Sequence, residues 1–587
     1  MTKYISPDIY FERVVRDERF RQLERLPLDC VAFLGFSERG PIQEPVRVTS
    51  WDSFKQRFGS YMPGCNLAYA VYGFFNNGGK ECFVTRVARI DDPDESKNAA
   101  RATAVLRDLY SRGTIRVEAS SEGSWGNKLK VAVGVPKRVH RSVVTHDIEP
   151  GATSARVEVS KGFEKGALVR LTDGRQEAFA RVREVKQGEV VWEEPIELEL
   201  NRGRTTIENV EFKLTITAED DFEIFDNLSM DPEHSRYFEK VVNRESLYVR
   251  VFDMHSNTEP PYNFPQAMTE TVLEGGRDGR EWVTPEDFVG FSRGPGERRG
   301  LRAYLENEDI GLICLPDLFS ALEHSEGFRS VTDVVAVQRA AVELAENMRY
   351  VHVILDTPPG IGPIEAAAYR DHFDTRHAAI YYPWIKVLDE GGGVVTVPPC
   401  GHVAGIYAKM DEEYGVHKPP ANEPISDVVG VERVIDKDTQ DMIYPDGINC
   451  IRPFPGRGIR IWGSRTLSSN ALWRHVNVCR VFAMVCKSVE FGTQWAPFEP
   501  NDRELWKRLT RLLGTFLTQM WREGFLVGET PEQAFYVKCD EETNPPEVRD
   551  AGEVVTEIGL AIVRPLEYIV FRIGERVTDM VLETEHG

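Results

Sequence analysis

The sequence predicts an α/β protein of several domains, into which a β-rich domain is inserted. Short apolar runs alternate with amphipathic helical segments between residues 301 and 385, and this alternation is typical of a doubly wound layer with a parallel sheet. Between residues 111 and 262 the pattern changes to short β-favouring runs separated by Gly, Asp and Asn. The chain has 587 residues, which at the usual domain size corresponds to about three or four domains.

The N-terminal part of the chain begins as an arm and continues into the α/β layer. Its first residues alternate aromatic and charged side chains, and we interpret them as an extended arm. VAFLGF (31–36) is a short apolar run followed by the turn SERGP, as in a buried strand. WDSFKQRFG (51–59) predicts a helix that ends at Gly59, and ECFVTRV (81–87) repeats the buried-strand pattern.

The β-rich region opens near SWGNKL (124–129) and closes near FDNLSMDPEH (225–234). Runs inside it such as TIRVEA, KLKVAVGV and FKLTITA favour strands. The α/β alternation then resumes. DVVAVQRAAVELAENM (333–348) predicts a helix, and YVHVILD (350–356) and AAIYYPWI (378–385) predict strands on either side of a further helix.

A last block contains two long helical segments, at 469–490 and 502–523, followed by the strand-like runs AFYVKCD, TEIGLAIV and EYIVFRIG. The second helix is predicted to have Asn501 as its N-cap, with Glu504 three residues further on. Gly524 stands just beyond its end, where a helix commonly stops. This block is therefore a separate, mixed α/β unit.

Composition narrows the classes of function. The formal net charge of −22 repels phosphate backbones, so we expect protein partners and no nucleic acid. No run approaches 18 consecutive apolar residues and the N-terminus lacks an apolar signal core, so we expect synthesis in the cytoplasm and no membrane insertion. The nine cysteines are scattered without a CxxC pair, which predicts structural thiols and neither a disulfide framework nor a metal site.

One turn invites the interpretation of a phosphate-binding loop. GFFNNGGKE (73–81) is rich in glycine and ends near a lysine, as such loops do. However, Phe74 stands where the motif needs Gly, and Glu81 stands where it needs Ser or Thr. We interpret Lys80 as part of a tight turn before a buried strand.

A second turn, DTPPGIG (356–362), follows a predicted strand at a place where doubly wound folds often bind ligands. Asp356 could be a catalytic or metal-binding carboxylate there, or a turn residue that bonds its own backbone. The trio Asp356, His377 and Ser464 has the residue types of a serine hydrolase, but the chain has no G-x-S-x-G elbow and no H-E-x-x-H. We expect no catalytic residue, no cofactor and no metal; an α/β hydrolase or nucleotide-binding enzyme is the alternative.

Dense motifs in the second half of the chain resemble contractile tail sheath proteins. The matching segments are GVHKPPAN (415–422), GINCIRPFPGRGIRIWGSRTL (447–467), WAPFEPND (495–502), 505–544 and IGLAIVRPLEYIVFRIG (558–574). YISPDIYFERV, VAFLGFSERGP, SWGNKLKV, LEGGRDG and YYPWIKV extend the resemblance into the rest of the chain. The segment from about 136 to 210 is unmatched.

The resemblance implies a structural subunit of the sheath of a phage tail, an R-type bacteriocin or a related contractile injection system, and not an enzyme. Such subunits stack as six-fold rings around an inner tube and shorten on a trigger, which drives the tube through a membrane. The implied partners are further copies of the chain, the tube protein, and baseplate and tail terminator proteins. A baseplate or terminator protein with the same fold is the alternative. After assembly in the bacterial cytoplasm the chain would become part of a virion tail or injection particle.

The resemblance and the local patterns together divide the chain into five predicted parts. The core is expected to have a subtilisin-like topology without hydrolytic activity. The parts are an N-terminal arm (1–20), an α/β core (21–110 and 263–430), an inserted β-rich outer domain (111–262), a C-terminal domain that faces the tube (431–565) and a C-terminal arm (566–587).

The helix at 502–523 carries the residues that we expect to contact the tube. Its apolar positions form one buried face. Arg503, Lys507 and Arg511 recur every four residues and so form one basic stripe on the other face. This stripe would attract an acidic tube surface; a solvated helix face is the alternative.

Both ends of the chain carry short β-favouring runs, at 5–15 and 577–582. Because isolated strands leave backbone donors and acceptors unpaired, each run needs a sheet to join. The resemblance implies that arms of neighbouring subunits pair on the C-terminal domain of a third; pairing within one subunit is the alternative. The residues expected in these inter-subunit strands are Ile5, Ile9, Phe11, Arg13, Tyr568, Val570, Phe571 and Val577.

Overall fold

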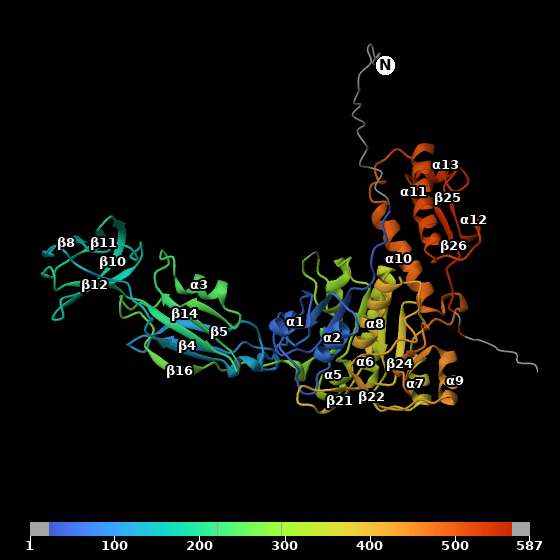
Figure 1. Cartoon of the computed structure of the whole chain (residues 1–587), viewed down its shortest axis with the longest axis horizontal. Coiled ribbons are helices and arrows are strands. Elements are labelled where there is room, and N and C mark those ends of the chain that lie inside the picture. Colours follow the sequence, from blue (N-terminus) through green and yellow to red (C-terminus); the bar gives the residue numbers. More distant parts are fainter. Residues whose placement is uncertain (1–22, 220, 295, 566, 568–587) are drawn as a thin grey trace, which may run out of the picture.

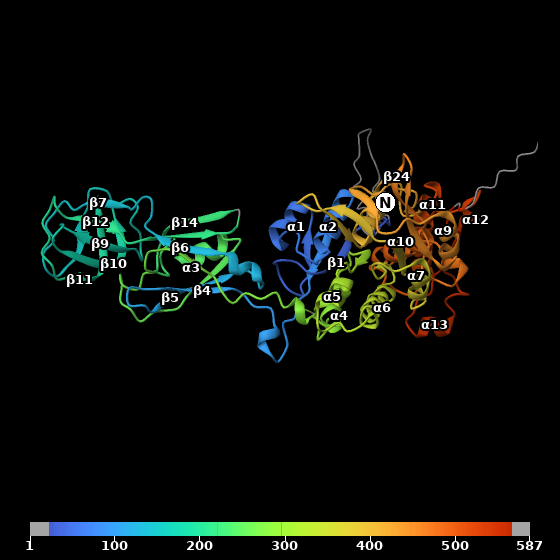
Figure 2. The ribbon, with the colours of Figure 1, turned by 90° about the horizontal axis from the view of Figure 1, so that it is seen from below.

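The computed structural model of the protein describes residues 23–219, 221–294, 296–565 and 567. Figure 1 shows an elongated molecule with an α/β body, a β-rich extension on one side of the body and a helical C-terminal part above it. Figure 2, from below, shows the same succession of parts along the long axis. The multidomain α/β class predicted from the sequence is confirmed.

An eight-stranded sheet forms the centre of the body, in the order β2-β3-β1-β17-β18-β19-β23-β24. Its six inner strands are parallel, and the two edge strands β2 (Val46–Val48) and β24 (Gly458–Trp462) are antiparallel to their neighbours. The parallel strands are β1 (Val31–Gly35), β3 (Cys82–Arg86), β17 (Leu312–Cys314), β18 (His352–Asp356), β19 (Ala378–Tyr382) and β23 (Ile448–Phe454).

Helices cover both faces of this sheet, as a doubly wound layer requires. Val31 and Phe33 of β1 belong to a core with one set of helices, whereas Ala32 and Leu34 belong to a core with the other set. The first set is α1 (Trp51–Phe58), α2 (Leu67–Asn76) and α8 (Cys400–Glu413). The second set is α4 (Pro285–Val289), α5 (Leu318–His324), α6 (Val331–Met348) and α7 (Pro363–Arg370).

A small antiparallel sheet of β20 (Ile385–Leu388), β21 (Val394–Val397) and β22 (Val428–Val431) lies below the body in Figure 1. The β-rich extension consists of two modules with separate cores. The proximal module contains β4 (Thr103–Arg107), β5 (Gly113–Ala119), β6 (Lys130–Gly134), β13 (Phe212–Thr217), β14 (Phe222–Leu228), α3 (Phe238–Glu245), β15 (Val249–Asp253) and β16 (Met268–Val272).

The distal module is a six-stranded sheet that closes on itself. It consists of β7 (Arg141–Val143), β8 (Ala152–Arg156), β9 (Leu168–Thr172), β10 (Glu177–Lys186), β11 (Glu189–Ile196) and β12 (Thr206–Asn209). Its two edges meet where Thr145 N donates to Arg156 O over 2.9 Å and Glu158 N donates to Val143 O over 3.0 Å. This module coincides with the segment that lacks a family resemblance.

The C-terminal part combines the long helices α10 (Val476–Gly492) and α11 (Arg503–Arg522) with a two-stranded sheet. The sheet pairs β25 (Phe535–Lys538) with β26 (Glu557–Leu560). Short helices α12 (Pro531–Ala534) and α13 (Pro546–Asp550) flank it. A further short helix, α9 (Lys437–Ile443), lies beside the body (Figure 1).

Two details differ from the sequence-based expectations. The N-cap of α11 is Asp502, whose carboxylate accepts from Glu504 N and Leu505 N, whereas Asn501 bonds the indole of Trp506. β23 and β24 belong to the central sheet, although the residues from 431 onward were assigned to the C-terminal domain. The reason is that β23 pairs with β19, a contact distant in sequence. The domain boundaries otherwise remain predictions.

Asp317 joins three elements at the carboxyl edge of the sheet. Its buried carboxylate accepts from Phe36 N over 2.7 Å, from Leu67 N over 3.2 Å and from Asn66 N. Burial raises the pKa of Asp317 to about 7, although the three N–H donors act against this shift. A Cβ at Gly35 would lie 2.4 Å from the carboxylate, so this close approach requires glycine. The start of α2 is thereby tied to β1 and α5.

We expect Asp317→Asn to lower the free energy of unfolding by about 1–3 kcal/mol, because the amide has one acceptor oxygen for three buried donors. Chemical denaturation of the unassembled subunit measures this change. Asp371→Asn is the control, since its side chain is 77% exposed, and it should change the free energy by less than about 0.5 kcal/mol. Equal losses in the two variants would show that the three hydrogen bonds contribute nothing.

Candidate functional site

The glycine turn at 77–80 is a packed turn without the geometry of a phosphate loop. β3 follows it, so no helix N-terminus points at the loop. A Cβ at Gly79 would lie 2.3 Å from the ring of Phe74, which explains the glycine by packing against α2. The Lys80 ammonium is exposed and forms an ion pair with Glu412 of α8. The turn therefore connects α2 and β3 beside α8.

Asp356, His377 and Ser464 do not converge. Asp356 is level with Tyr381 in the sheet, whereas His377 stands just before Ala378, which is level with Val353. At about 3.3 Å per residue, His377 lies about 13 Å along the strands from Asp356. Ser464 follows β24, which is three strands away from β18. The structure therefore provides no triad from these residues.

Asp356 has a structural contact instead. Its buried carboxylate accepts from the N–H of Cys400, the first residue of α8, over 3.2 Å. Burial raises the pKa of Asp356 to about 7. The described residues contain no group of three or more His, Cys, Asp or Glu side chains that could hold a metal ion. Among them, no helix is both long and apolar enough to cross a membrane.

Helix α11 is amphipathic, as its sequence predicted. Its buried face consists of Leu505, Trp506, Leu509, Leu513, Phe516, Leu517 and Met520, and Leu512 is half-buried. Gly524, at φ 85°, follows its end, and Phe525 N donates to Met520 O over 3.0 Å. The helix thus ends where the glycine adopts the left-handed conformation.

Arg503, Lys507 and Arg511 are all exposed on the opposite face of α11. Two of them already have acidic neighbours: Arg503 pairs with Glu541, and Lys507 lies 3.0 Å from Glu504. Arg511 has no ion-pair partner within the described part of the chain and lines the groove described below. The stripe therefore carries less free positive charge than the three residues alone suggest.

Sequence reasoning missed Phe498 in the loop between α10 and α11. Its side chain is fully exposed, and its φ of 75° lies in the left-handed region that bulky residues avoid. The loop around it is held by the ion pair of Glu499 with Arg508 and by Trp495 stacked on Arg508. Because strained backbone positions cluster at functional sites, Phe498 is a candidate contact residue. Its position between two prolines was the available signal.

A groove of about 860 Å³ runs between α11 and β25. Its walls include Gly514 and Thr518 of α11 and Phe535 and Val537 of β25. The sheet beside it has two strands among the described residues, so each strand has one edge without a neighbouring strand there. Tyr536, in the middle of β25, is 58% exposed. This site can accept an additional strand.

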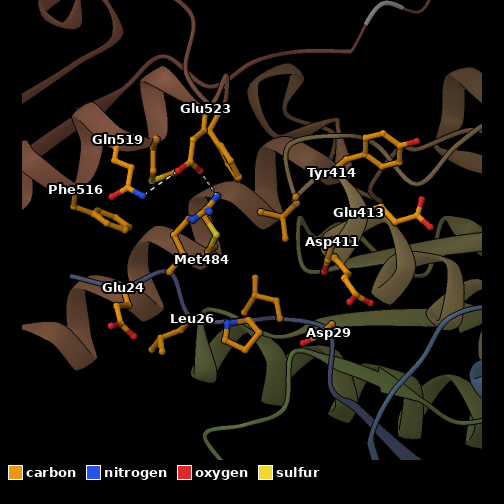
Figure 3. A pocket seen from close by; sticks show the side chains of 18 of the residues that line it. Glu24, Leu26, Asp29, Asp411, Glu413, Tyr414, Met484, Phe516, Gln519 and Glu523 are labelled. Carbon is orange, nitrogen blue, oxygen red and sulfur yellow. Dashed lines mark hydrogen bonds and ion pairs between the residues drawn. The ribbon is translucent and has the colours of Figure 1, made fainter. Parts of the chain in front are cut away.

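A second pocket, of about 630 Å³, is lined on one side by residues 23–29, which we call the N-terminal segment. Figure 3 labels residues that line this pocket: Glu24, Leu26 and Asp29 of this segment, Met484 of α10, Phe516 of α11 and Asp411 of α8. Arg25 forms an ion pair of 2.6 Å with Glu523 at the end of α11. The pocket therefore lies where the body, the C-terminal helices and the N-terminal segment meet.

The predicted arm residues Ile5, Ile9, Phe11 and Arg13 lie outside the described residues. Tyr568, Val570, Phe571 and Val577 lie outside them too. The described chain ends at Glu567, whose carboxylate pairs with Arg465 over 2.7 Å and accepts from Tyr444 over 2.8 Å. The inter-subunit strands thus stay a prediction. The structure does describe the residues next to both arms, which are 23–29 and Glu567.

The comparisons with known proteins agree with this arrangement. The phage tail sheath protein central domain matches residues 303–467, and the phage tail sheath C-terminal domain matches residues 468–574. A putative prophage major tail sheath protein of Pseudomonas aeruginosa strain UCBPP-PA14 is 28% identical over 55% of this chain and 80% of its own length. The tail sheath protein of Vibrio phage KVP40 is 24% identical over 58% of this chain and 52% of its own length.

The fold has a counterpart in a solved assembly. The helical sheath of the anti-feeding prophage, in its contracted state, matches 98% of this chain and all of that chain with a TM-score of 0.53 at 17% identity. The sheath tail protein of Desulfitobacterium hafniense matches 91% of this chain and 94% of its own with a TM-score of 0.51 at 11% identity. These likenesses concern the fold.

Within the described part of the chain, the unpaired outer edges of β25 and β26 define a protein that can join further chains by strand addition. The two matched domains make the family specific: residues 303–574 belong to the contractile tail sheath protein family.

We expect Lys80→Ala to leave sheath contraction unchanged, because Lys80 is exposed and its partner Glu412 is also in solvent. Contraction of assembled sheaths, followed by electron microscopy, measures this. Glu412→Ala is the matched control, since it removes the other half of the same ion pair. Loss of contraction in folded, assembled Lys80→Ala sheaths, with normal contraction in the control, would reopen the enzyme interpretation.

Proposed function

We propose that the chain is the structural subunit of a contractile tail sheath. It polymerises as stacked six-fold rings around an inner tube and shortens on a trigger to drive the tube through a membrane. Family membership supports the general statement. The single observation that carries the assembly mechanism is the two-stranded sheet of β25 and β26, whose outer edges have no partner strand within the described part of the chain.

The same proposal includes the place of assembly, the partners and the absence of catalysis. The chain is synthesised and assembled in the bacterial cytoplasm and becomes part of a virion tail or an injection particle. Its partners are further copies of itself, the tube protein, and baseplate and terminator proteins. No catalytic activity contributes, in line with the dispersed positions of Asp356, His377 and Ser464. A baseplate or terminator role is the alternative, and the length of the polymer discriminates, because a terminator stops at one ring.

We propose that the arms complete the C-terminal sheet of neighbouring subunits. A two-stranded sheet is marginal in water, and here α11 covers β25 from one side only, along the groove that also exposes Tyr536. A strand added at either edge satisfies backbone donors and acceptors and covers apolar surface of Phe535 and Val537. The arm residues Ile9, Phe11, Val570 and Val577 would set the register through alternate side chains.

Deletion of residues 1–16 should leave a folded, soluble subunit that forms no cylinders, because it removes a strand and no core residue of the described structure. Electron microscopy and sedimentation of the purified chain measure this. Deletion of residues 583–587 is the control, since it shortens the other end without removing the predicted strand at 577–582. Cylinders of normal length from the first variant would falsify strand exchange by the N-terminal arm.

We propose that the exposed face of α11 contacts the inner tube through Arg503, Lys507 and Arg511, with Phe498 as an apolar contact at the same end of the helix. Arg503 follows Phe498 by five residues, so the two lie within about 18 Å of each other even if the chain is extended. Because Arg503 and Lys507 already neighbour Glu541 and Glu504, the attraction should be weaker than that of three free cations.

Reversal of the stripe by Arg503→Glu, Lys507→Glu and Arg511→Glu should weaken tube binding about tenfold or more and change its salt dependence, since charge complementarity is lost. Co-sedimentation of tube with sheath at several salt concentrations measures both quantities. Arg183→Glu with Lys186→Glu is the control, because these cations are similarly exposed on the distal module. Unchanged binding and salt dependence of the stripe variant would exclude this contact.

A further inference from the structure

We infer that α10 determines where both arms leave the subunit. Its side chains bind the main chain near the first and near the last described residues. This inference rests on the proposed exchange of arms and names the residues that position them. Ser488, Lys487 and Arg480 hold the N-terminal segment. Asn477 and the neighbouring Arg465 hold Val563 and Glu567. These are positioning residues, since none of them belongs to an arm.

The grip on the N-terminal segment consists of three successive contacts to its main chain. Leu26 N donates to Ser488 Oγ over 3.0 Å, Lys487 Nζ donates to Pro27 O over 3.1 Å, and an Arg480 guanidinium N–H donates to Leu28 O over 3.0 Å. The three helix residues lie seven and eight positions apart and so share one face of α10. The order of contacts makes the segment run antiparallel to the helix.

These contacts specify register because they involve backbone atoms and buried side chains. Lys487 is 4% and Arg480 is 2% exposed, and burial lowers the pKa of Lys487. If the segment slipped by one residue, both cations would lose their carbonyl partners while buried, which is unfavourable. Leu23 then packs at the last turn of α10, where a Cβ at Gly492 would lie 2.7 Å from its Cγ. The N-terminal arm therefore starts at the C-terminal end of α10.

The grip on the other end lies at the first turn of α10. Asn477 Nδ2 donates to Val563 O over 3.0 Å. Glu567 pairs with Arg465 over 2.7 Å, and His475, the N-cap of α10, lies 3.6 Å from the same carboxylate. The C-terminal arm therefore starts near the N-terminal end of α10. A helix of 17 residues is about 25 Å long, so α10 spaces the two starting points.

The body of the subunit is coupled to this spacing through Arg480. Besides Leu28 O, its guanidinium binds Asp411 of α8 in a bidentate pair of 2.7 and 2.5 Å. Burial disfavours the charge of Arg480, yet the Asp411 carboxylate outweighs this effect and raises the pKa of Arg480. The same side chain thus links body, helix and N-terminal segment. A movement of the body relative to the arms must move α10 with it.

The experiment removes the grip without touching Arg480. Lys487→Met with Ser488→Ala removes both contacts to Leu26 and Pro27 and keeps apolar volume in the site. Glu490→Gln, on an exposed position of the same helix, is the matched control. Sedimentation measures the critical concentration for cylinder formation, and helical reconstruction measures rise and rotation per ring. We expect a critical concentration about tenfold higher, or an altered or heterogeneous rise, in the grip variant alone.

A second measurement does not depend on the folding of a variant. In the wild-type subunit below its assembly concentration, hydrogen exchange of the Leu26 amide should be slow, because its N–H donates to Ser488 Oγ of α10. Exchange at the rate of a free peptide would overturn the inference. So would normal assembly, rise and rotation of the grip variant. If deletion of residues 1–16 abolishes cylinders while the grip variant is normal, strand exchange stands and only the role of α10 fails.

Discussion

The buried ion pair of Arg480 and Asp411 is the constraint on which the arrangement of the subunit depends. The two side chains belong to α10 and α8, and each is almost inaccessible to water. Such a pair contributes little net stability, because desolvation offsets the attraction, but loss of one partner leaves a buried charge without compensation. We therefore expect the pair mainly to favour one relative position of the C-terminal helices and the α/β body. The carbonyl of Leu28 completes the site, so that the chain entering β1 is held by the same guanidinium.

The sheet of the distal module and the sheet of β25 and β26 differ in their edges, which are joined in the first and, among the described residues, open in the second. The distal module closes its six strands, with the edges joined through Thr145 and Arg156, and such a closed sheet offers no edge for further strands. At the opposite end of the molecule, β25 and β26 form a pair that needs more strands for independent stability. The pair of β25 and β26 can therefore accept a further strand, whereas the closed sheet of the distal module cannot. In the proposed assembly, strand exchange therefore belongs to the end of the elongated subunit that carries β25 and β26 (Figure 1).

The sequence predicted elements whose determinants are local. The buried run at 31–36, the amphipathic face of α11 and the stop at Gly524 depend on residues within a few turns of each other, and all three are found. The assignment of β23 to the C-terminal domain was wrong because its position depends on pairing with β19. Asn501 is the N-cap predicted from Glu504 three residues further on, but in the structure Asn501 accepts from the Trp506 indole and Asp502 caps the helix. The sequence did not reveal the grip of α10 on residues 26–28, since the partners are more than 450 positions apart.

The high negative charge of the subunit explains why backbone hydrogen bonds are suitable connections between copies of the chain. Each subunit carries a formal net charge of −22, so neighbouring copies repel one another at short range, although screening limits this repulsion to about 8 Å at physiological salt. Contacts between charged side chains would have to be arranged against that background and would change whenever subunits rotate. Backbone hydrogen bonds between an arm and a sheet edge carry no net charge and keep their geometry as long as the strand stays paired. In the proposed assembly, the acidic surface can then change its contacts during a rearrangement, while strand pairing by the arms keeps the subunits connected.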